Sequence, residues 1–418
     1  MDLLLHFLAR PVYIDGSIGV FLTGASRQIC FHLASGICSF PIWLIDLSLG
    51  LSRFVASDIP PRSRVNLYWP FELRNCARGD HSDWRSFAGK NLFGGVKVMG
   101  DPLKPFHEID AADLDSLSLR DEMDSRGYLL VRNLLPADDL KPLLSEIGRI
   151  IHSAGWLLHG HSPLDRIANA SAACGDPDPL FKQVYEQVFN LECFHALAHH
   201  PTLRRVMNLL VGPDLLIHPK PISRLIFPNC ERFIVHAHQD HQAIAGDAES
   251  FTAWMPLHDC PAELGPLQIL EASHRFGLQR ADPETGFIPK ETAHGGSWVS
   301  GRIDAGDVLI FHSLTVHAAS PNVSDRLRIS MDCRFQNYHR ALNPSTVVFA
   351  GSSDGTRSWE KTYAQWRSHE LKYFWKRMPL QFKPSKIELT QLAQSADSPE
   401  MRSRYARILN KLELEGLG

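Results

Sequence analysis

A cluster of residue types that bind metals lies near the middle of the sequence, where residues 236–241 read His-Ala-His-Gln-Asp-His. In an extended strand, residues two apart project from the same face, so His238 and Asp240 are expected to point the same way. A histidine and an aspartate in this relation can take two neighbouring positions around one metal ion. His236 shares their face and is an alternative ligand, whereas His241 falls on the opposite face.

A third ligand is needed from another part of the chain, and His317 is the best candidate. Two histidines and one carboxylate on one triangular face of an octahedron leave three positions open. That arrangement suits an iron(II) ion that must bind a bidentate keto acid and O2 together. The nearby His312 has the wrong strand parity for this role.

An arginine, Arg328, follows His317 by eleven residues. Residues 321–324, Pro-Asn-Val-Ser, have the composition of a turn. If they form the loop of an antiparallel hairpin, His317 lies opposite Arg328, with Cβ atoms about 5 Å apart. A buried guanidinium needs an anionic partner, and the far carboxylate of a keto diacid supplies one with bidentate geometry. Arg326 shares this face but lies nearer the loop, and it is the alternative.

Three regions are expected along the chain: an accessory segment at 1–105, a central domain at 106–340 and a helical extension at 341–418. The first is apolar and then rich in proline, arginine and glycine. Its residues 29–45 carry no formal charge. Because this run is short and contains proline, a buried or membrane-surface helix is a better interpretation than a membrane span.

The central region begins with a strand at 127–132 and a helix that opens at Pro136. A second helix is expected at 178–200 and a third from Pro201 to Gly212. Between residues 215 and 337, short apolar runs alternate with turn residues, which predicts an antiparallel barrel or double sheet.

The C-terminal region carries aromatic residues at helical spacing. Trp359, Tyr363, Trp366 and Tyr373 recur at steps that predict one face of a single helix. Packing of this face against the sheet is the favoured interpretation, and a lid over the active site is the alternative.

Composition excludes several classes of protein. The chain of 418 residues has a formal net charge of −3, so no basic field is available to attract nucleic acid. Its eight cysteines are scattered without a Cys-x-x-Cys pair, which argues against a disulfide framework or a zinc knuckle. Free thiols in a reducing compartment are expected, so the chain is predicted to be cytoplasmic, with peripheral membrane association through the N-terminus as an alternative.

Several motifs together resemble the phytanoyl-CoA dioxygenase family of iron(II)- and 2-oxoglutarate-dependent oxygenases. The resemblance covers about residues 117–337. It rests on the Gly-Tyr strand at 127–128, His-His-Pro at 199–201, Lys-Pro at 220–221, His-Gln-Asp at 238–240, Trp254, Gly-Pro-Leu-Gln at 265–268, Ser-His at 273–274, His317, Asn322 and Arg328. Two departures are Ala237, where the family usually has tryptophan, and Glu-Ala in place of Pro-Gly before Ser273.

The resemblance implies a mainly β fold with flanking helices, built on a double-stranded β-helix (jelly roll, cupin-like). It implies iron(II) bound by His238, Asp240 and His317, and 2-oxoglutarate bound through Arg328. Trp254 and Lys220 correspond to positions that family members place near the co-substrate.

The expected activity is oxidation of an unactivated C–H bond of a small, lipid- or terpenoid-like molecule by O2, with release of succinate and CO2. Asp240 is present, whereas a halogenase of this type lacks that carboxylate, so hydroxylation, desaturation or ring chemistry is favoured over halogenation, with hydroxylation as the first expectation. The alternatives are a cupin-like metal enzyme that does not use 2-oxoglutarate and a non-catalytic, membrane-associated scaffold. The sequence indicates neither the substrate nor the oligomeric state.

Overall fold

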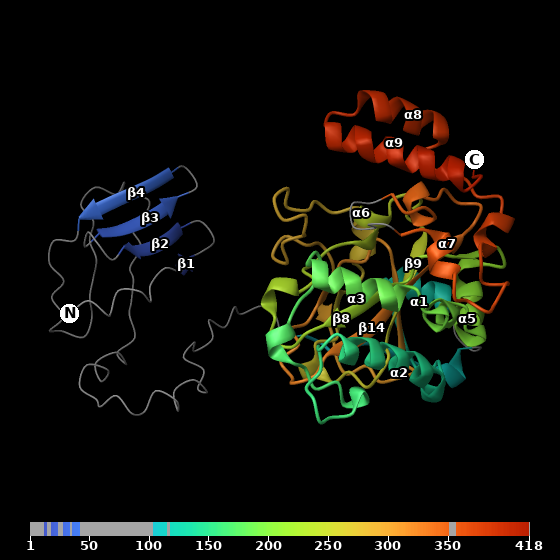
Figure 1. Cartoon of the computed structure of the whole chain (residues 1–418), viewed down its shortest axis with the longest axis horizontal. Helices are drawn as coiled ribbons and strands as arrows, with labels where there is room; N and C mark the ends of the chain where they lie inside the picture. The colour runs from blue at the N-terminus through green and yellow to red at the C-terminus, as the bar shows by residue number, and fades with distance from the viewer. Residues whose placement is uncertain are drawn as a thin grey trace. The chain divides into compact units, whose positions relative to one another are not determined.

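A computed structural model describes residues 103–114, 118–350 and 357–417, together with the backbone of four strands near the N-terminus. The chain divides into two compact units, Met1–Lys97 and Val98–Gly418, and Figure 1 draws both. No helix among the described residues has the length and apolar character required to cross a bilayer.

The first unit contains an antiparallel sheet in the order β1 (Val12–Ile14), β2 (Ile18–Thr23), β3 (Gln28–Leu33) and β4 (Gly36–Pro41). The helix expected within residues 29–45 is therefore wrong for the part that is described. Only two residues separate the pair Leu33 and Gly36, as in a tight hairpin. β-Branched and aromatic residues in these runs favour strands. The proline-, arginine- and glycine-rich stretch lies outside the described residues.

The second unit is built on a seven-stranded sheet, which forms the wall behind the candidate site. Its order is β5-β6-β12-β9-β14-β7, and β8 also pairs with β14. All pairings are antiparallel except that of β5 with β6. The strands are β5 (Glu108–Asp110), β6 (Tyr128–Arg132), β7 (Leu215–Ile217), β8 (Ile222–Ile226), β9 (Ser250–Pro256), β12 (Val308–His312) and β14 (Arg328–Asn337).

A smaller antiparallel sheet faces the large one. It has the order β11 (Trp298–Val299), β10 (Leu267–Leu270) and β13 (His317–Ala319), and a single bridge from His238 to His317 extends it. Along the chain, β8, β9, β12 and β14 of the large sheet are interleaved with segments of the small sheet, as in a jelly roll. The double sheet expected between residues 215 and 337 is thereby confirmed.

The large sheet has two differently packed faces because side chains alternate along each strand. On its inner face Leu130, Trp254 and Leu309 pack with Ile269 and Val299 of the small sheet. On its outer face the intervening residues of the same strands belong to a second, larger core shared with the helices. The central strands β6, β9 and β12 are thus buried on both faces.

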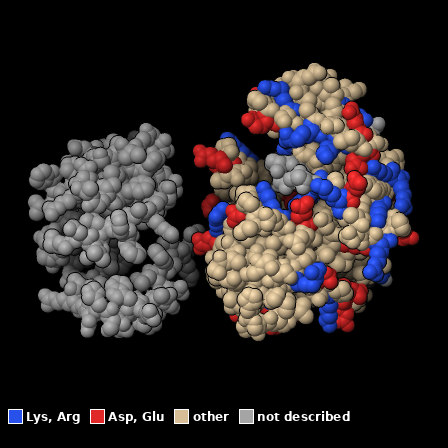
Figure 2. Space-filling view, in the orientation of Figure 1, with Lys and Arg blue, Asp and Glu red and all other residues tan. Residues whose placement is uncertain are grey.

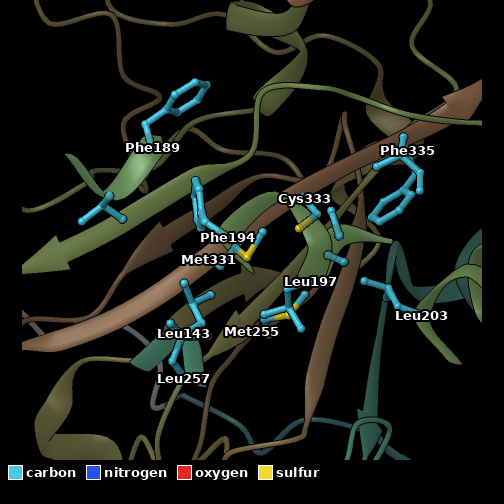
Figure 3. Packing of buried hydrophobic residues seen from close by; sticks show 14 of the residues in the cluster. Leu143, Phe189, Phe194, Leu197, Leu203, Met255, Leu257, Met331, Cys333 and Phe335 are labelled. Carbon is cyan, nitrogen blue, oxygen red and sulfur yellow. The ribbon is translucent and has the colours of Figure 1, made fainter. Parts of the chain in front are cut away.

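Five helices cover the outer face. They are α1 (Leu119–Arg126), α2 (Ala137–Ser153), α3 (Pro179–Phe189), α4 (Glu192–Ala198) and α5 (Pro201–Val211). In Figure 3, Phe194 and Leu197 of α4 lie beside Met255 of β9 and Met331 of β14. The single helix expected at 178–200 is instead two, because Leu191 takes an extended backbone between α3 and α4.

The long aromatic helix expected near the C-terminus is wrong. Helix α7 covers only Trp359–Tyr363, and Tyr373 has a left-handed backbone with φ of 52° that no helix continues through. The rings nevertheless gather: the centroids of Trp359 and Tyr363 are 5.2 Å apart, and those of Tyr363 and Tyr373 are 4.8 Å apart. Trp359 and Tyr363 are buried in the core that the helices share with the large sheet.

The last two helices, α8 (Lys386–Ser395) and α9 (Pro399–Leu414), form a hairpin that lies at the top of the unit in Figure 1. With these helices included, the unit is mixed α and β. A double sheet with flanking helices is confirmed, whereas the description of the fold as mainly β is not.

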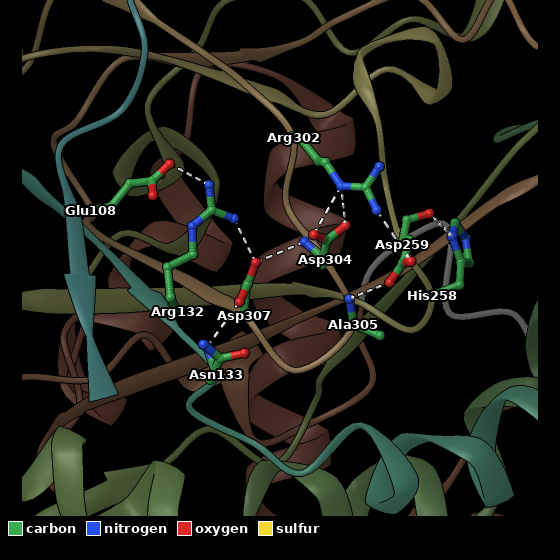
Figure 4. Close-up of polar contacts among 9 residues, drawn as sticks. All are labelled: Glu108, Arg132, Asn133, His258, Asp259, Arg302, Asp304, Ala305 and Asp307. Atoms are coloured by element: carbon green, nitrogen blue, oxygen red, sulfur yellow. Dashed lines mark hydrogen bonds and ion pairs between the residues drawn. The ribbon is translucent and has the colours of Figure 1, made fainter. Parts of the chain in front are cut away.

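A polar network closes one end of the sheets (Figure 4). The Asp307 carboxylate accepts hydrogen bonds from Arg132 Nη1 at 2.6 Å and from the backbone N–H of Asn133 at 2.9 Å. His258 Nδ1 lies 2.7 Å from the Asp259 carbonyl oxygen, while its Nε2 accepts the Ile329 N–H at 2.9 Å. Both ring nitrogens are therefore satisfied in one neutral tautomer.

His258 makes the stability of the fold sensitive to acid. Burial, with the charge of Arg166, lowers the pKa of His258 from 6.5 to about 3. The unfolded chain takes up this proton first, so stability is complete above pH 6.5 and falls as the pH drops toward 3. At pH 5 the loss from this group is about 2 kcal/mol.

Urea unfolding between pH 7 and 4 measures this loss. His258→Gln, which keeps a donor and an acceptor but does not titrate, is expected to flatten the pH dependence. Substitution of the exposed His161 by glutamine is the control and leaves the slope unchanged. An equal slope in wild type and His258→Gln would contradict the assignment.

Candidate metal centre

Three side chains from two separate segments converge between the sheets. His238 lies at the bridge to the small sheet, Asp240 is the first residue of the short helix α6 (Asp240–Ile244), and His317 begins β13. One ligand atom from each lies within 4.8 Å of the others. Within the described part of the chain, no other group of three histidine, cysteine or acidic residues meets this criterion.

Backbone hydrogen bonds orient both imidazoles. Nδ1 of His238 lies 2.8 Å from the carbonyl oxygen of His236, and Nδ1 of His317 lies 3.0 Å from that of Thr315. If Nδ1 carries the proton in each ring, the lone pair of Nε2 is left to face a metal. Burial, followed by the charge of His317, lowers the pKa of His238 to about 4, which favours the neutral ring that a metal requires.

Two neighbours hold the carboxylate of Asp240. Its Oδ2 accepts a hydrogen bond from Thr252 Oγ1 at 2.5 Å, and its Oδ1 accepts one from Arg334 Nη2 at 3.2 Å. Oδ1 also lies 3.9 Å from His238 Nε2. Burial alone raises the pKa of Asp240, but Arg334 and the two histidines outweigh it, and the pKa lies well below its usual value. The group is therefore an anion at neutral pH.

The other histidines near the motif lie elsewhere. His236 is exposed, and neither it nor His241 or His312 joins the converging group. His312 Nε2 instead lies 3.8 Å from Glu249. The structure therefore brings together the three residues selected by spacing. It does so without the regular strand expected there, because the chain enters α6 at Asp240.

The hairpin expected to place His317 opposite Arg328 is wrong. Strand β13 pairs with β10, whereas β14 pairs with β8 and β9, so the two residues belong to different sheets. The connecting segment crosses between the sheets and is held by Asn322, whose Nδ2 donates to the carbonyl oxygens of Ile226 and Arg326. These bonds replace the ladder that a simple hairpin would need.

Arg328 nevertheless reaches the space between the sheets. It lies on the inner face of β14, is 1% exposed and donates to the carbonyl oxygen of Gly265. Its guanidinium carbon lies 5.9 Å from the centre of the Trp254 ring. Burial lowers the pKa of Arg328, and no acidic side chain among the described residues forms an ion pair with it. Arg326, the alternative, lies in the loop and is about half exposed.

Around Arg328, three buried donors have no hydrogen-bond partner among the described residues. They are Nε of Arg328, Nε1 of Trp254 and the hydroxyl of Ser330. Unpartnered buried donors are costly, so their grouping on β9 and β14 marks a place where a polar ligand fits. Lys220 lies between β7 and β8, where its Nζ donates to the carbonyl oxygen of Val348 at 2.9 Å. A role for Lys220 at the co-substrate stays a prediction.

Sequence reasoning missed two residues that touch Asp240, namely Thr252 and Arg334. A signal was present in β14, whose residues alternate strictly between polar and apolar. Arg328, Ser330, Asp332, Arg334 and Gln336 face inward, while Ile329, Met331, Cys333 and Phe335 face the helices. A fully polar face on a buried strand indicates that the space it lines is a site.

Comparison with known proteins gives one matching family model, that of phytanoyl-CoA dioxygenase (PhyH), over residues 123–330. A curated relative from Streptomyces arenae, 1-deoxypentalenic acid 11-beta-hydroxylase, is 24% identical over 255 residues, which cover 56% of this chain and 86% of the relative. The protein of the same name from Streptomyces exfoliatus is 24% identical over 264 residues, with the same coverage.

Solved structures similar to this chain include the non-haem alpha ketoglutarate dependent epimerase SnoN, with 23% identity, a TM-score of 0.42, and coverage of 59% of this chain and 92% of that one. Another is the non-haem monooxygenase ThoJ, with 18% identity, a TM-score of 0.39, and coverage of 54% and 79%.

The matched segment begins in α1 and ends in β14, so it covers most of the large sheet, the small sheet and all three converging side chains. Such a match, with two curated hydroxylases beside it, supports a non-haem iron oxygenase that uses 2-oxoglutarate. Through this domain, the chain belongs to the phytanoyl-CoA dioxygenase family.

Proposed function

We propose that this protein hydroxylates an unactivated C–H bond of a small organic molecule, using iron(II), 2-oxoglutarate and O2 and releasing succinate and CO2. The observation that carries this proposal is the meeting of His238, Asp240 and His317 beside a buried arginine that has no acidic partner. A reaction of this class needs a metal with open coordination positions. It also needs an anion-binding group whose distance from the metal matches the length of a keto acid.

The three side chains fit iron(II). Two neutral imidazoles and one carboxylate form the donor set of non-haem iron oxygenases, and they leave coordination positions for other ligands. The hydrogen bonds on His238, His317 and Asp240 supply the outer support that such ligands require. When bound, the metal supplies the O2 chemistry, and the protein supplies the geometry.

The buried donors around Arg328 suit the far carboxylate of 2-oxoglutarate. A guanidinium binds a carboxylate with two parallel hydrogen bonds, and the free Nε of Arg328 provides one donor. Ser330 and Trp254 have further unpartnered donors on the same inner face. The ring of Trp254 lies beside this guanidinium, with its centre 5.9 Å from the guanidinium carbon.

The substrate is proposed to be a compact, largely apolar molecule of the terpenoid type. The two Streptomyces relatives are named for hydroxylation of 1-deoxypentalenic acid, and they support this class for the present chain. The described surface visible in Figure 2 intersperses basic and acidic side chains, as expected for an enzyme of small molecules rather than of nucleic acid.

Substitution of a proposed metal-binding residue is expected to weaken metal binding strongly. Asp240→Ala or His317→Ala should weaken Mn(II) binding, measured anaerobically by calorimetry, by more than the roughly 10–100-fold that loss of an outer-shell partner costs. His236→Ala, in the same motif but exposed, should bind Mn(II) as wild type does. Loss of binding in His236→Ala with retention in Asp240→Ala would overturn the ligand assignment.

Replacement of the buried arginine is expected to separate keto-acid binding from metal binding. Arg328→Met should lower the affinity for 2-oxoglutarate by at least about tenfold, since it removes charged hydrogen bonds worth roughly 1.5–3 kcal/mol each. Mn(II) affinity should be unchanged. Arg326→Met, two residues away and exposed, is the matched control. Equal 2-oxoglutarate affinity in wild type and Arg328→Met would contradict the assignment.

Turnover itself is tested by product analysis. The iron-loaded protein, given 2-oxoglutarate, O2 and 1-deoxypentalenic acid or related terpenoids, should form succinate in proportion to a product heavier by one oxygen atom. Oxidation that proceeds equally well without 2-oxoglutarate would instead point to a cupin-like enzyme that does not use the keto acid.

A further inference from the structure

Around the candidate metal site, the inner faces of β8, β9 and β14, together with Asp240, carry more positive than negative charge. Three arginines, Arg224, Arg328 and Arg334, face two carboxylates, Asp240 and Asp332. The Arg224 guanidinium binds Asp332 at 2.9 Å, and that of Arg334 binds Asp240 at 3.2 Å. Since three positive charges meet two negative ones, the net charge of these five side chains is +1.

Iron(II) and 2-oxoglutarate, the two ligands of the proposed function, do not remove this excess positive charge. Iron(II) adds two positive charges, and 2-oxoglutarate adds two negative ones, so the sum stays at +1. An uncompensated charge between two buried sheets is costly. The site is therefore complementary to a molecule that brings one further negative charge.

Arg334 is the arginine best placed to receive it. Arg328 is assigned to the keto acid, and Arg224 has a buried carboxylate, Asp332, to itself. The carboxylate beside Arg334 is shared, because Asp240 also binds Thr252 and is a proposed metal ligand. Nε of Arg334 has no hydrogen-bond partner among the described residues.

The position of Arg334 places it at the opposite end of the site from Arg328. The two lie on one face of β14, six residues apart, so their Cα atoms are separated by about 20 Å. The side chain of Arg334 is 14% exposed, whereas that of Arg328 is buried almost completely. Arg334 thus borders the more accessible end, where a substrate beside the metal can reach it.

We propose that Arg334 binds an anionic group, a carboxylate, of the substrate next to the metal. This inference rests on the proposed function and names the chemical class of its substrate, a carboxylic acid. Its Nη2 holds Asp240, and its Nε, which has no other partner among the described residues, is left for the substrate.

The test compares acids with their neutral amides. Calorimetry on the full chain loaded with Mn(II) and 2-oxoglutarate, without O2, measures the binding of cyclic carboxylic acids of increasing size, from cyclohexanecarboxylate to decalincarboxylate, and of the matching primary amides. The acids are expected to bind at least about tenfold more tightly than the amides, the ratio that charged hydrogen bonds provide.

Variants test whether Arg334 is the residue that causes the preference for acids over amides. Arg334→Leu is expected to abolish the preference for acids, and Arg334→Lys, which keeps the charge and protects folding, to retain part of it. Arg126→Leu removes a remote, half-buried arginine that binds Glu122 and Glu271, and it should leave the preference intact.

Two outcomes overturn the inference while the proposed function stands. In one, the loaded wild-type protein binds no acid or binds acids and amides equally. In the other, the preference survives in Arg334→Leu. Failure of the wild-type protein to bind Mn(II) or 2-oxoglutarate is a different result, because it overturns the proposed function together with the inference.

Discussion

One pair of backbone hydrogen bonds determines whether the site exists. The N–H of His238 donates to the carbonyl oxygen of His317, and the N–H of His317 donates to that of His238, both at 3.0 Å. This bridge joins segments almost eighty residues apart and sets their side chains next to each other. The small sheet holds one end of the bridge through the pairing of β13 with β10. A change in that register would separate the imidazoles, since side chains alternate in direction along a strand.

The large sheet also holds ionised groups between two layers of protein, where burial makes an unpaired charge costly. Its inner face pairs each carboxylate with an arginine, and a hydroxyl on β9 further supports Asp240. Its outer face is apolar and packs against the helices. Buried ion pairs contribute little net stability, so the apolar face has to supply the free energy that holds the polar face in place.

The convergence of His238, Asp240 and His317 was predictable from residue types, spacing and family resemblance, because a His-x-Asp pair with a distant histidine is a specific pattern. The double sheet was predicted from the alternation of short apolar runs with turn residues. The pairing of β13 was not predictable, since local turn chemistry favoured a hairpin, whereas Asn322 bonds backbone groups that lie far apart along the chain. The single helix predicted from the aromatic residues after Trp359 was wrong for a related reason. Aromatic residues at helical spacing also occur in irregular segments whose rings pack together in a core. Arg334 was missed because its partner, Asp240, is remote in sequence.

Strand β14 is shared between two tasks that proteins often assign to separate elements. Met331 and Cys333 fill the helical core, while their immediate neighbours Asp332 and Arg334 line the reactive space. A backbone shift caused by altered volume on one side is transmitted at once to the other, because a pleated ribbon moves as a unit. Directed evolution of this scaffold therefore cannot treat thermal robustness and selectivity as separate traits: conservative repacking beneath the helices is itself a way to retune the reaction.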